Sequence, residues 1–178
     1  LTVTPAPVAT VGVAPTSQTL LVGANAPAFT ATTRDGGGNV LTGRVVTWSS
    51  SDNGIATIDP NTGVATGVAA GTVTITATSE GKTGTASLEV DKVPVATVNV
   101  SPPVGIILLI GGTTQFTAET RDAGNNLLTG RVITWSSSND LIATVDNTGL
   151  VTGTGLGVAT ITATSEGQSG TASVGVGP

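Results

Sequence analysis

One stretch of the chain occurs twice without a change. Residues 74–81 and residues 160–167 both read Thr-Ile-Thr-Ala-Thr-Ser-Glu-Gly. In each copy apolar side chains alternate with threonines, and a period of two predicts a strand with one buried face and one polar face. We therefore expect two structural repeats, each containing this strand, with Ile75 and Ile161 pointing into the two cores.

The duplication also predicts the domain organisation. The 178 residues divide into one repeat over residues 8–91, a short linker over 92–94 and a second repeat over 95–178, and each repeat is long enough to bury a small core of its own. Residues 1–7 resemble residues 88–94, so we interpret them as the tail of the last strand of a preceding unit. A leader segment is the alternative.

The expected fold class is all-β, with two tandem two-sheet β-sandwiches. Thr, Gly and β-branched residues dominate, whereas the chain has two Trp, two Phe and no Tyr or Met; these preferences favour strands and turns. In the first repeat we expect strands near residues 8–14, 19–22, 27–34, 44–50, 55–59, 63–68, 72–79 and 83–90. The expected core residues of the two repeats are Phe29, Val46, Trp48, Ile58, Val73, Ile75 and Leu88, and Phe116, Ile133, Trp135, Val145, Ala159, Ile161 and Val174.

Composition argues against several function classes. The formal charge is -5 and 10% of the residues are charged, so the chain offers no basic surface for nucleic acid. The apolar run from Val104 to Ile110 is far shorter than the roughly 20 residues of a membrane-spanning helix. His, Cys and Tyr are absent, which removes the usual nucleophile and base pairs of enzymes. We expect neither catalysis nor membrane insertion.

Calcium is the one cofactor that the sequence suggests. Carboxylate and amide oxygens in loops are its preferred ligands, and the candidates are Asp35 with Asn39, Asp52 in the next loop, and Asp91 at the junction. The alternative is that these residues stabilise tight turns through bonds to the local backbone. Beyond calcium we expect no cofactor.

Paired arginines flank one loop in each repeat. They are Arg34 and Arg44 in the first repeat and Arg121 and Arg131 in the second. An ion pair between Arg44 and a nearby acid is the simpler interpretation. Contact with a sugar or phosphate is the other.

The two repeats diverge most in one apolar segment of the second. Residues 104–110 are far more apolar than the aligned residues 16–22, and alternation can bury only about half of them. Either local packing covers the segment, or it contacts another domain or another chain, because exposed apolar edges invite pairing. The candidate interface residues are Ile106, Ile107, Leu108, Leu109 and Ile110.

An ordered motif in each repeat resembles the group 2 bacterial immunoglobulin-like domain. In the first repeat it consists of Trp48-Ser49-Ser50-Ser51, Ile55 to Asp59, Thr62 to Gly67, and Gly71. The second copy has Trp135-Ser136-Ser137-Ser138, Ile142 to Asp146, Thr148 to Gly153, and Gly157. The turn from Asp35 to Leu41 is also similar to that of the related invasin-type domains.

The resemblance implies that the all-β chain forms two tandem immunoglobulin-like β-sandwiches. It also implies a module of bacterial surface proteins, secreted enzymes or phage virions. We expect a non-enzymatic, extracellular structural module, a spacer in a repetitive surface or fibre-forming protein that self-assembles into filaments. Its expected partners are copies of itself or neighbouring immunoglobulin-like repeats. The alternatives are an adhesin-type module that binds a host protein or glycan, and a phage decoration or tail domain.

Overall fold

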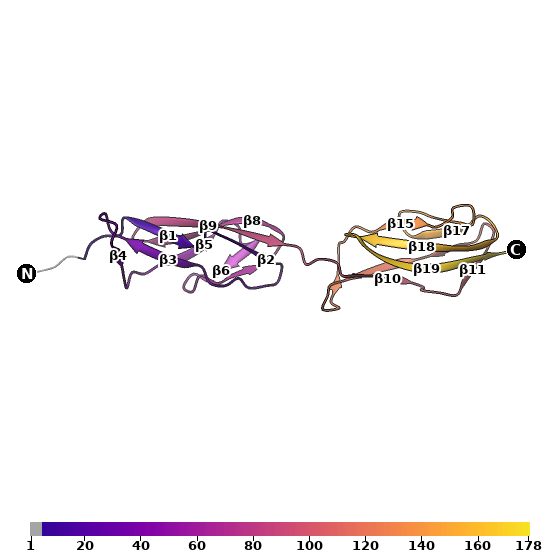
Figure 1. Cartoon of the computed structure of the whole chain (residues 1–178), viewed down its shortest axis with the longest axis horizontal. Coiled ribbons are helices and arrows are strands. Elements are labelled where there is room, and N and C mark those ends of the chain that lie inside the picture. Colours follow the sequence, from indigo (N-terminus) through magenta and orange to yellow (C-terminus); the bar gives the residue numbers. More distant parts are fainter. Residues whose placement is uncertain (1–4) are drawn as a thin grey trace, which may run out of the picture. The chain divides into compact units, whose positions relative to one another are not determined.

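The computed structural model describes residues 5–178 and forms two compact units (Figure 1). The boundary lies between Val93 and Pro94. Strands, turns and loops make up both units, and the described residues include no helix that could cross a membrane. The expectation for residues 1–7 falls partly on residues 1–4, which lie outside the described residues.

The described part of the first domain, from residue 5 onward, contains nine strands. They are β1 (Thr10–Ala14), β2 (Ser17–Leu21), β3 (Thr30–Arg34), β4 (Val40–Leu41), β5 (Thr47–Ser50), β6 (Ala56–Ile58), β7 (Ala65–Gly67), β8 (Gly71–Ser79) and β9 (Lys82–Asp91). One sheet has the order β2-β9-β8-β5, a second has β1-β3-β4, and β6 pairs with β7. All of these pairings are antiparallel except that of β2 with β9, which is parallel.

The second domain repeats this arrangement. Its strands are β10 (Thr97–Ser101), β11 (Ile106–Leu109), β12 (Thr113–Gln115), β13 (Thr117–Arg121), β14 (Leu127–Leu128), β15 (Thr134–Ser137), β16 (Ala143–Val145), β17 (Leu150–Gly153), β18 (Gly157–Ser165) and β19 (Gln168–Gly177). The sheets are β11-β19-β18-β15, β10-β13-β14 and β12-β17-β16, and β11 runs parallel to β19.

The first domain has no full counterpart of strand β12 among its described residues. A single β-bridge between Asn25 and Thr66 takes its place. This bridge corresponds to the pairing of Thr113 with Thr152, and Pro27 lies two residues after Asn25, where the ladder between β12 and β17 continues in the second domain. Proline has no backbone N–H and cannot donate to a ladder. The expected strand over residues 27–34 begins only at Thr30, and its counterpart β13 likewise begins at Thr117.

The duplicated stretch forms most of β8 and β18 and supplies the centre of each core. Ile75, Ala77, Ile161 and Ala163 are fully buried, whereas the intervening threonines are exposed or half-buried. The predicted alternation is thus confirmed for this strand, and the all-β class is confirmed for the chain.

The other expected core residues divide into two groups. Phe29, Trp48, Val73, Leu88, Phe116, Ala159 and Val174 are buried. Val46, Ile58, Ile133, Trp135 and Val145 are half-buried and pack against their cores. In the first domain the rings of Phe29 and Trp48 lie 6.2 Å apart between centroids, at 40° to one another, a favourable aromatic arrangement.

Two glycines allow β1 and β10 to cross the last strand of their domains. A Cβ atom on Gly84 of β9 would overlap the carbonyl oxygen of Val11 in β1, and Gly170 of β19 stands in the same relation to Val98 in β10. These positions have no room for a side chain because backbone approaches backbone there. The crossing closes each core on one side.

Candidate functional site

The turn between β8 and β9 places a glutamate at one end of the first domain. Ser79 pairs with Lys82, and the two residues between them, Glu80 and Gly81, have φ values of 49° and 78°. Positive φ at both central positions characterises the type I′ turns that join two-residue hairpins. Glycine and asparagine are the usual residues in such turns, so a glutamate at this position is uncommon.

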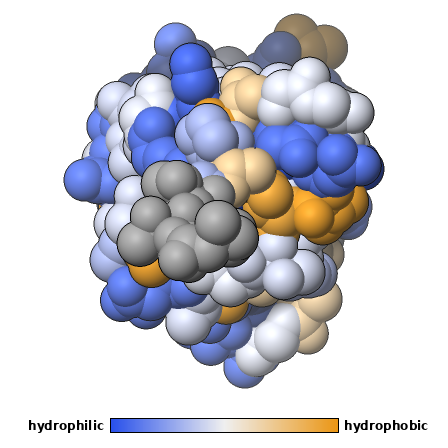
Figure 2. Space-filling view, turned by 90° about the vertical axis from the view of Figure 1, so that its left-hand side faces the viewer, coloured by the Kyte–Doolittle hydropathy of each residue, from blue (hydrophilic) through white to orange (hydrophobic). Residues whose placement is uncertain are grey.

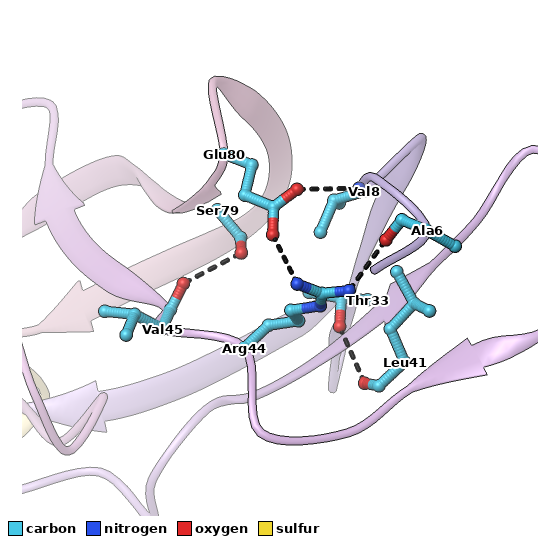
Figure 3. Close-up of polar contacts among 8 residues, drawn as sticks. All are labelled: Ala6, Val8, Thr33, Leu41, Arg44, Val45, Ser79 and Glu80. Atoms are coloured by element: carbon cyan, nitrogen blue, oxygen red, sulfur yellow. Dashed lines mark hydrogen bonds and ion pairs between the residues drawn. The ribbon is translucent and has the colours of Figure 1, made fainter. Parts of the chain in front are cut away.

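The Glu80 carboxylate joins the start of the domain to the segment before β5 (Figure 3). One carboxylate oxygen pairs with Arg44 Nη1 at 3.0 Å, and the other accepts the backbone N–H of Val8 at 2.9 Å. Arg44 Nη2 also donates to the carbonyl oxygen of Ala6 at 2.7 Å. We call Arg44, Glu80 and the backbone of Ala6 and Val8 the first clamp.

The second domain has the same arrangement. The turn residues Glu166 and Gly167 have φ values of 49° and 82°. Glu166 pairs with Arg131 Nη1 at 2.9 Å and accepts the backbone N–H of Val95 at 3.1 Å. We call Arg131, Glu166 and the backbone of Val95 the second clamp. Each clamp thus fastens the segment that leads into its own domain.

A hollow of about 400 Å³ lies beside the first clamp. Its lining comes from residues 43–45, Thr47 and residues 78–80. Figure 2 shows this end of the first domain, where hydrophilic surface surrounds a small group of apolar residues. The charged residues of the hollow, Arg44 and Glu80, form an ion pair with each other. Their interaction links two segments of the same domain.

One hydrogen bond beneath the clamps differs between the two copies. The buried hydroxyl of Ser79 donates to the carbonyl oxygen of Val45 at 2.8 Å. The equivalent Ser165 Oγ is buried without a partner among the described residues. The duplicated sequence therefore sits in slightly different surroundings in the two domains.

The ion pair expected for Arg44 is present, and its partner is Glu80. The other arginines of the two loops bind their own loops. Arg34 Nη1 donates to the carbonyl oxygen of Gly38 at 2.9 Å, and Arg121 Nη1 donates to that of Asn125 at 3.0 Å. These contacts hold the turn that separates β3 from β4 and β13 from β14.

The structure brings Asp35 and Asn39 together. Asp35 Oδ1 accepts the backbone N–H groups of Gly37 and Asn39, both at 2.9 Å, and the Asn39 side chain donates to both carboxylate oxygens. The side-chain hydrogen bond from Asn39, followed by its backbone N–H, lowers the pKa of Asp35 below 3.8. Asp122 and Asn126 form the same turn, with the same direction of pKa shift and the same leading cause.

The other two calcium candidates lie in separate places. Asp52 follows β5 and accepts the N–H of Gly54 at 2.8 Å, and Asp91 ends β9 in register with Leu21. Among the described residues no group of three or more acidic, His or Cys side chains is arranged to hold a metal ion. The calcium site stays a prediction, and turn formation describes what Asp35 and Asp52 do in the structure.

The apolar segment of the second domain is only partly covered by its own domain. Leu108 is buried and Ile106 is half-buried against the core. Ile107, Leu109 and Ile110 are exposed, with Ile107 reaching 79%. Local packing therefore accounts for two of the five residues, and the predicted interface with another surface stays a prediction for the others.

The sequence interpretation did not identify the roles of Glu80 and Glu166. Their partners lie 36 and 35 positions away in the chain, so local spacing could not reveal them. A signal was present, however, because a Glu-Gly pair between two alternating strands places the glutamate in a left-handed conformation that disfavours side chains. A residue kept at such a position in both repeats indicates a role for its side chain.

Comparison with known proteins agrees with the architecture. The bacterial Ig-like domain (group 2) matches residues 7–90 and again residues 94–176. Ice-binding protein 1 of Shewanella frigidimarina is 34% identical over 160 residues, which cover 89% of this chain and 18% of that protein. A Clostridium acetobutylicum protein is 35% identical over 119 residues, covering 66% of this chain and 12% of its own length.

The chain thus spans less than a fifth of either relative.

Among solved structures, domains 4 and 5 of the S-layer protein SbsC superpose with a TM-score of 0.46 at 25% identity, covering 97% of this chain and 100% of that one. Mouse cadherin-23 EC22-24 gives a TM-score of 0.44 at 20% identity, covering 94% of this chain and 64% of that one. Because the group 2 match accounts for nearly all of both units, the chain belongs to the bacterial Ig-like domain family, as two such domains in tandem.

Proposed function

We propose that the chain is a non-enzymatic, extracellular spacer in a repetitive bacterial surface protein. The observation that carries this proposal is the repetition of the clamp. Both domains use an arginine and a turn glutamate to fasten the backbone that leads into the sandwich. A spacer that holds its neighbours in the chain at a fixed distance needs its leading segment fastened to its own core.

The polar groups of the loops support the same proposal. The carboxylates of Asp35, Asp59, Asp122 and Asp146 accept hydrogen bonds from their own turns, so the loops are internally ordered. A carboxylate engaged in this way is less available as a general base or a ligand for another molecule. The family membership and the similarity to a much longer ice-binding protein fit a repeated structural unit.

Surface display tests the proposal directly. One, two or four copies of the chain are inserted between a cell-wall anchor and a terminal epitope, and antibody access to the epitope is measured by flow cytometry. A spacer predicts that access rises with copy number. It also predicts that Asp35→Asn and Asp122→Asn, which alter the loop surface, leave antibody access to the epitope unchanged at each copy number.

The outcome against the proposal is specific recognition. If the purified chain binds a host protein or a glycan on an array saturably, and Asp35→Asn or Asp122→Asn abolishes that binding, the loops act as a recognition surface. An epitope that is equally accessible at every copy number also contradicts the spacer role.

A further inference from the structure

The outer face of the sheet β11-β19-β18-β15 carries an apolar surface with a glycine floor. The strand register places Ile107 beside Gly175, and Gly175 beside Val158. In the next row Leu109 lies beside Gly177, and Leu156 directly precedes β18 at the same end of the sheet. We call Ile107, Leu109, Leu156, Val158, Gly175 and Gly177 the glycine-floored face.

The large side chains of this face are open to solvent within the chain. Ile107, Leu109, Leu156 and Val158 are 79%, 63%, 60% and 67% exposed. They form two ridges, one on β11 and one at the start of β18, and β19 between them contributes no outward side chain at Gly175 and Gly177. Contiguous exposed apolar surface of this kind marks an interaction site more often than scattered residues do.

Local packing does not require these two glycines. A Cβ atom on Gly175 would lie 3.9 Å from Ile107 Cγ1, and a Cβ on Gly177 would lie 3.9 Å from Ile107 Cγ2, both ordinary van der Waals distances. A glycine inside a strand weakens the strand and often marks close approach by another surface. Gly84 and Gly170 are explained by such approach within the domain, whereas Gly175 and Gly177 have no internal counterpart among the described residues.

The first domain shows what the same face looks like without this feature. There the register sets Thr19 beside Glu89 and Glu89 beside Thr72, while Leu21 lies beside Asp91. The floor of the first domain thus carries two carboxylates where the second domain has glycines. The second domain has no floor charges and has apolar ridges on both sides of the floor.

We propose that the glycine-floored face binds the same face of a second copy of this chain. The glycine floor forms a furrow between the two ridges, and such a surface is self-complementary. A rotation of one copy by 180° places a ridge of each copy in the furrow of the other, which is an isologous contact. The six residues are uncharged, so two copies meet there without the carboxylate repulsion that Glu89 and Asp91 would cause. This goes beyond the spacer role, since it adds a lateral contact between chains.

The face presents four large apolar side chains, far fewer than the about 20–30 residues a side of a standard interface, so we expect weak, concentration-dependent dimerisation. Repetition of the module on a surface would strengthen such a contact through effective concentration. The lateral contact does not depend on whether the spacer role holds, because it is measured on the isolated chain.

Sedimentation velocity of the full chain over a wide concentration range tests the proposal. The wild-type chain should show a weight-average sedimentation coefficient that rises with concentration. Ile107→Asp and Gly175→Glu should abolish the rise, and Gly175→Glu reproduces the residue that the first domain has at this position. Thermal melting followed by Trp135 fluorescence checks that each variant remains folded.

Val132→Asp is the matched control. Val132 is 80% exposed, is an aliphatic residue of the same domain, and precedes β15 outside the glycine-floored face. The proposal expects this variant to dimerise like the wild type.

Two results would overturn the proposal. A wild-type chain that stays monomeric at every concentration excludes the second copy and leaves the face to a different apolar partner. A dimer that survives both Ile107→Asp and Gly175→Glu assembles through another surface.

Discussion

Glu80 occupies a backbone conformation that an L-residue adopts at a cost of about 1–2 kcal/mol. Its φ of 49° recurs in Glu166, so the cost is borne in both domains. Asparagine would fit this turn better, but its shorter side chain could not match the reach of the glutamate. The ion pair with arginine and the bond to a backbone N–H offset the strain of the turn.

Removing the charge of Glu80 should weaken the first clamp. We expect Glu80→Gln to lower the unfolding free energy of the first domain by about 0.5–1 kcal/mol, because the Glu80 side chain is 39% exposed and solvent screens part of the attraction. Urea denaturation followed by Trp48 fluorescence in a Trp135→Phe background measures the change, and added salt should shrink it. Glu89→Gln, on the outer face of β9, is the control; an equal loss there would contradict the clamp.

Acid should destabilise the second domain through Asp146. The side-chain hydroxyl of Thr148, followed by the N–H groups of Leu150 and Thr148, lowers the pKa of Asp146 below 3.8. A lowered pKa means that the stabilisation is present above the ordinary aspartate range and is lost as the pH falls through the folded-state value. We therefore expect this stabilisation to be complete above about pH 5 and to be lost progressively as the pH falls below the ordinary aspartate pKa of about 3.9.

Asp146→Asn tests this pH dependence. In a Trp48→Phe background, urea midpoints measured by Trp135 fluorescence should be lower for the variant than for the unsubstituted chain near neutral pH, and the two should converge in acid. Asp140→Asn serves as the control, since the Asp140 carboxylate accepts no hydrogen bond within the described residues. A constant difference between Asp146→Asn and the wild type at all pH values would refute the assignment.

At the scale of the element, the crossing of β1 over β9 depends on Gly84. We expect Gly84→Ala to destabilise the first domain by about 1–3 kcal/mol, because the added methyl group would force β1 away from β9. Gly12→Ala is the matched control: a Cβ at Gly12 would lie 3.8 Å from the nearest carbonyl oxygen, that of Thr32. Thermal melting compares the stability of Gly84→Ala with that of Gly12→Ala. Similar losses of stability in the two variants would contradict a close approach of β1 to β9 at Gly84.

Strand patterns were predictable to the extent that they are local. The alternation of Ile75, Ala77 and the threonines indicated β8 correctly, because period two needs only neighbouring residues. Strand β4 was not predicted, since Val40 and Leu41 form a two-residue strand within a turn-rich segment. The row formed by Ile107, Gly175 and Val158 depends on strand register over more than 50 positions, which periodicity cannot supply.

At the scale of the whole molecule, each domain has its own core and its own tryptophan. Ile75 and Ile161 are both fully buried in separate clusters, and the two tryptophans of the chain lie one in each domain. The duplication predicted this organisation, because two copies of one core strand require two cores. The matches to residues 7–90 and 94–176 show the same division.

The separate cores make a reciprocal experiment available. Ile75→Ala should lower the unfolding free energy of the first domain by about 2–5 kcal/mol through the cavity it leaves, and Ile161→Ala should do the same in the second. Each is measured in a Trp135→Phe or Trp48→Phe background, so that a single tryptophan reports on one domain. Equal loss in both reporters from one substitution would show that the domains unfold as one unit.

The parallel pairing of β2 with β9 has a mechanical consequence. β2 lies near the start of the first domain and β9 is its last strand, so a pull on the two ends draws these strands in opposite directions along a common axis. The hydrogen bonds between Ser17–Leu21 and Ser87–Asp91 are then strained together, in shear, and do not open one after another. The pairing of β11 with β19 gives the second domain the same resistance to tension.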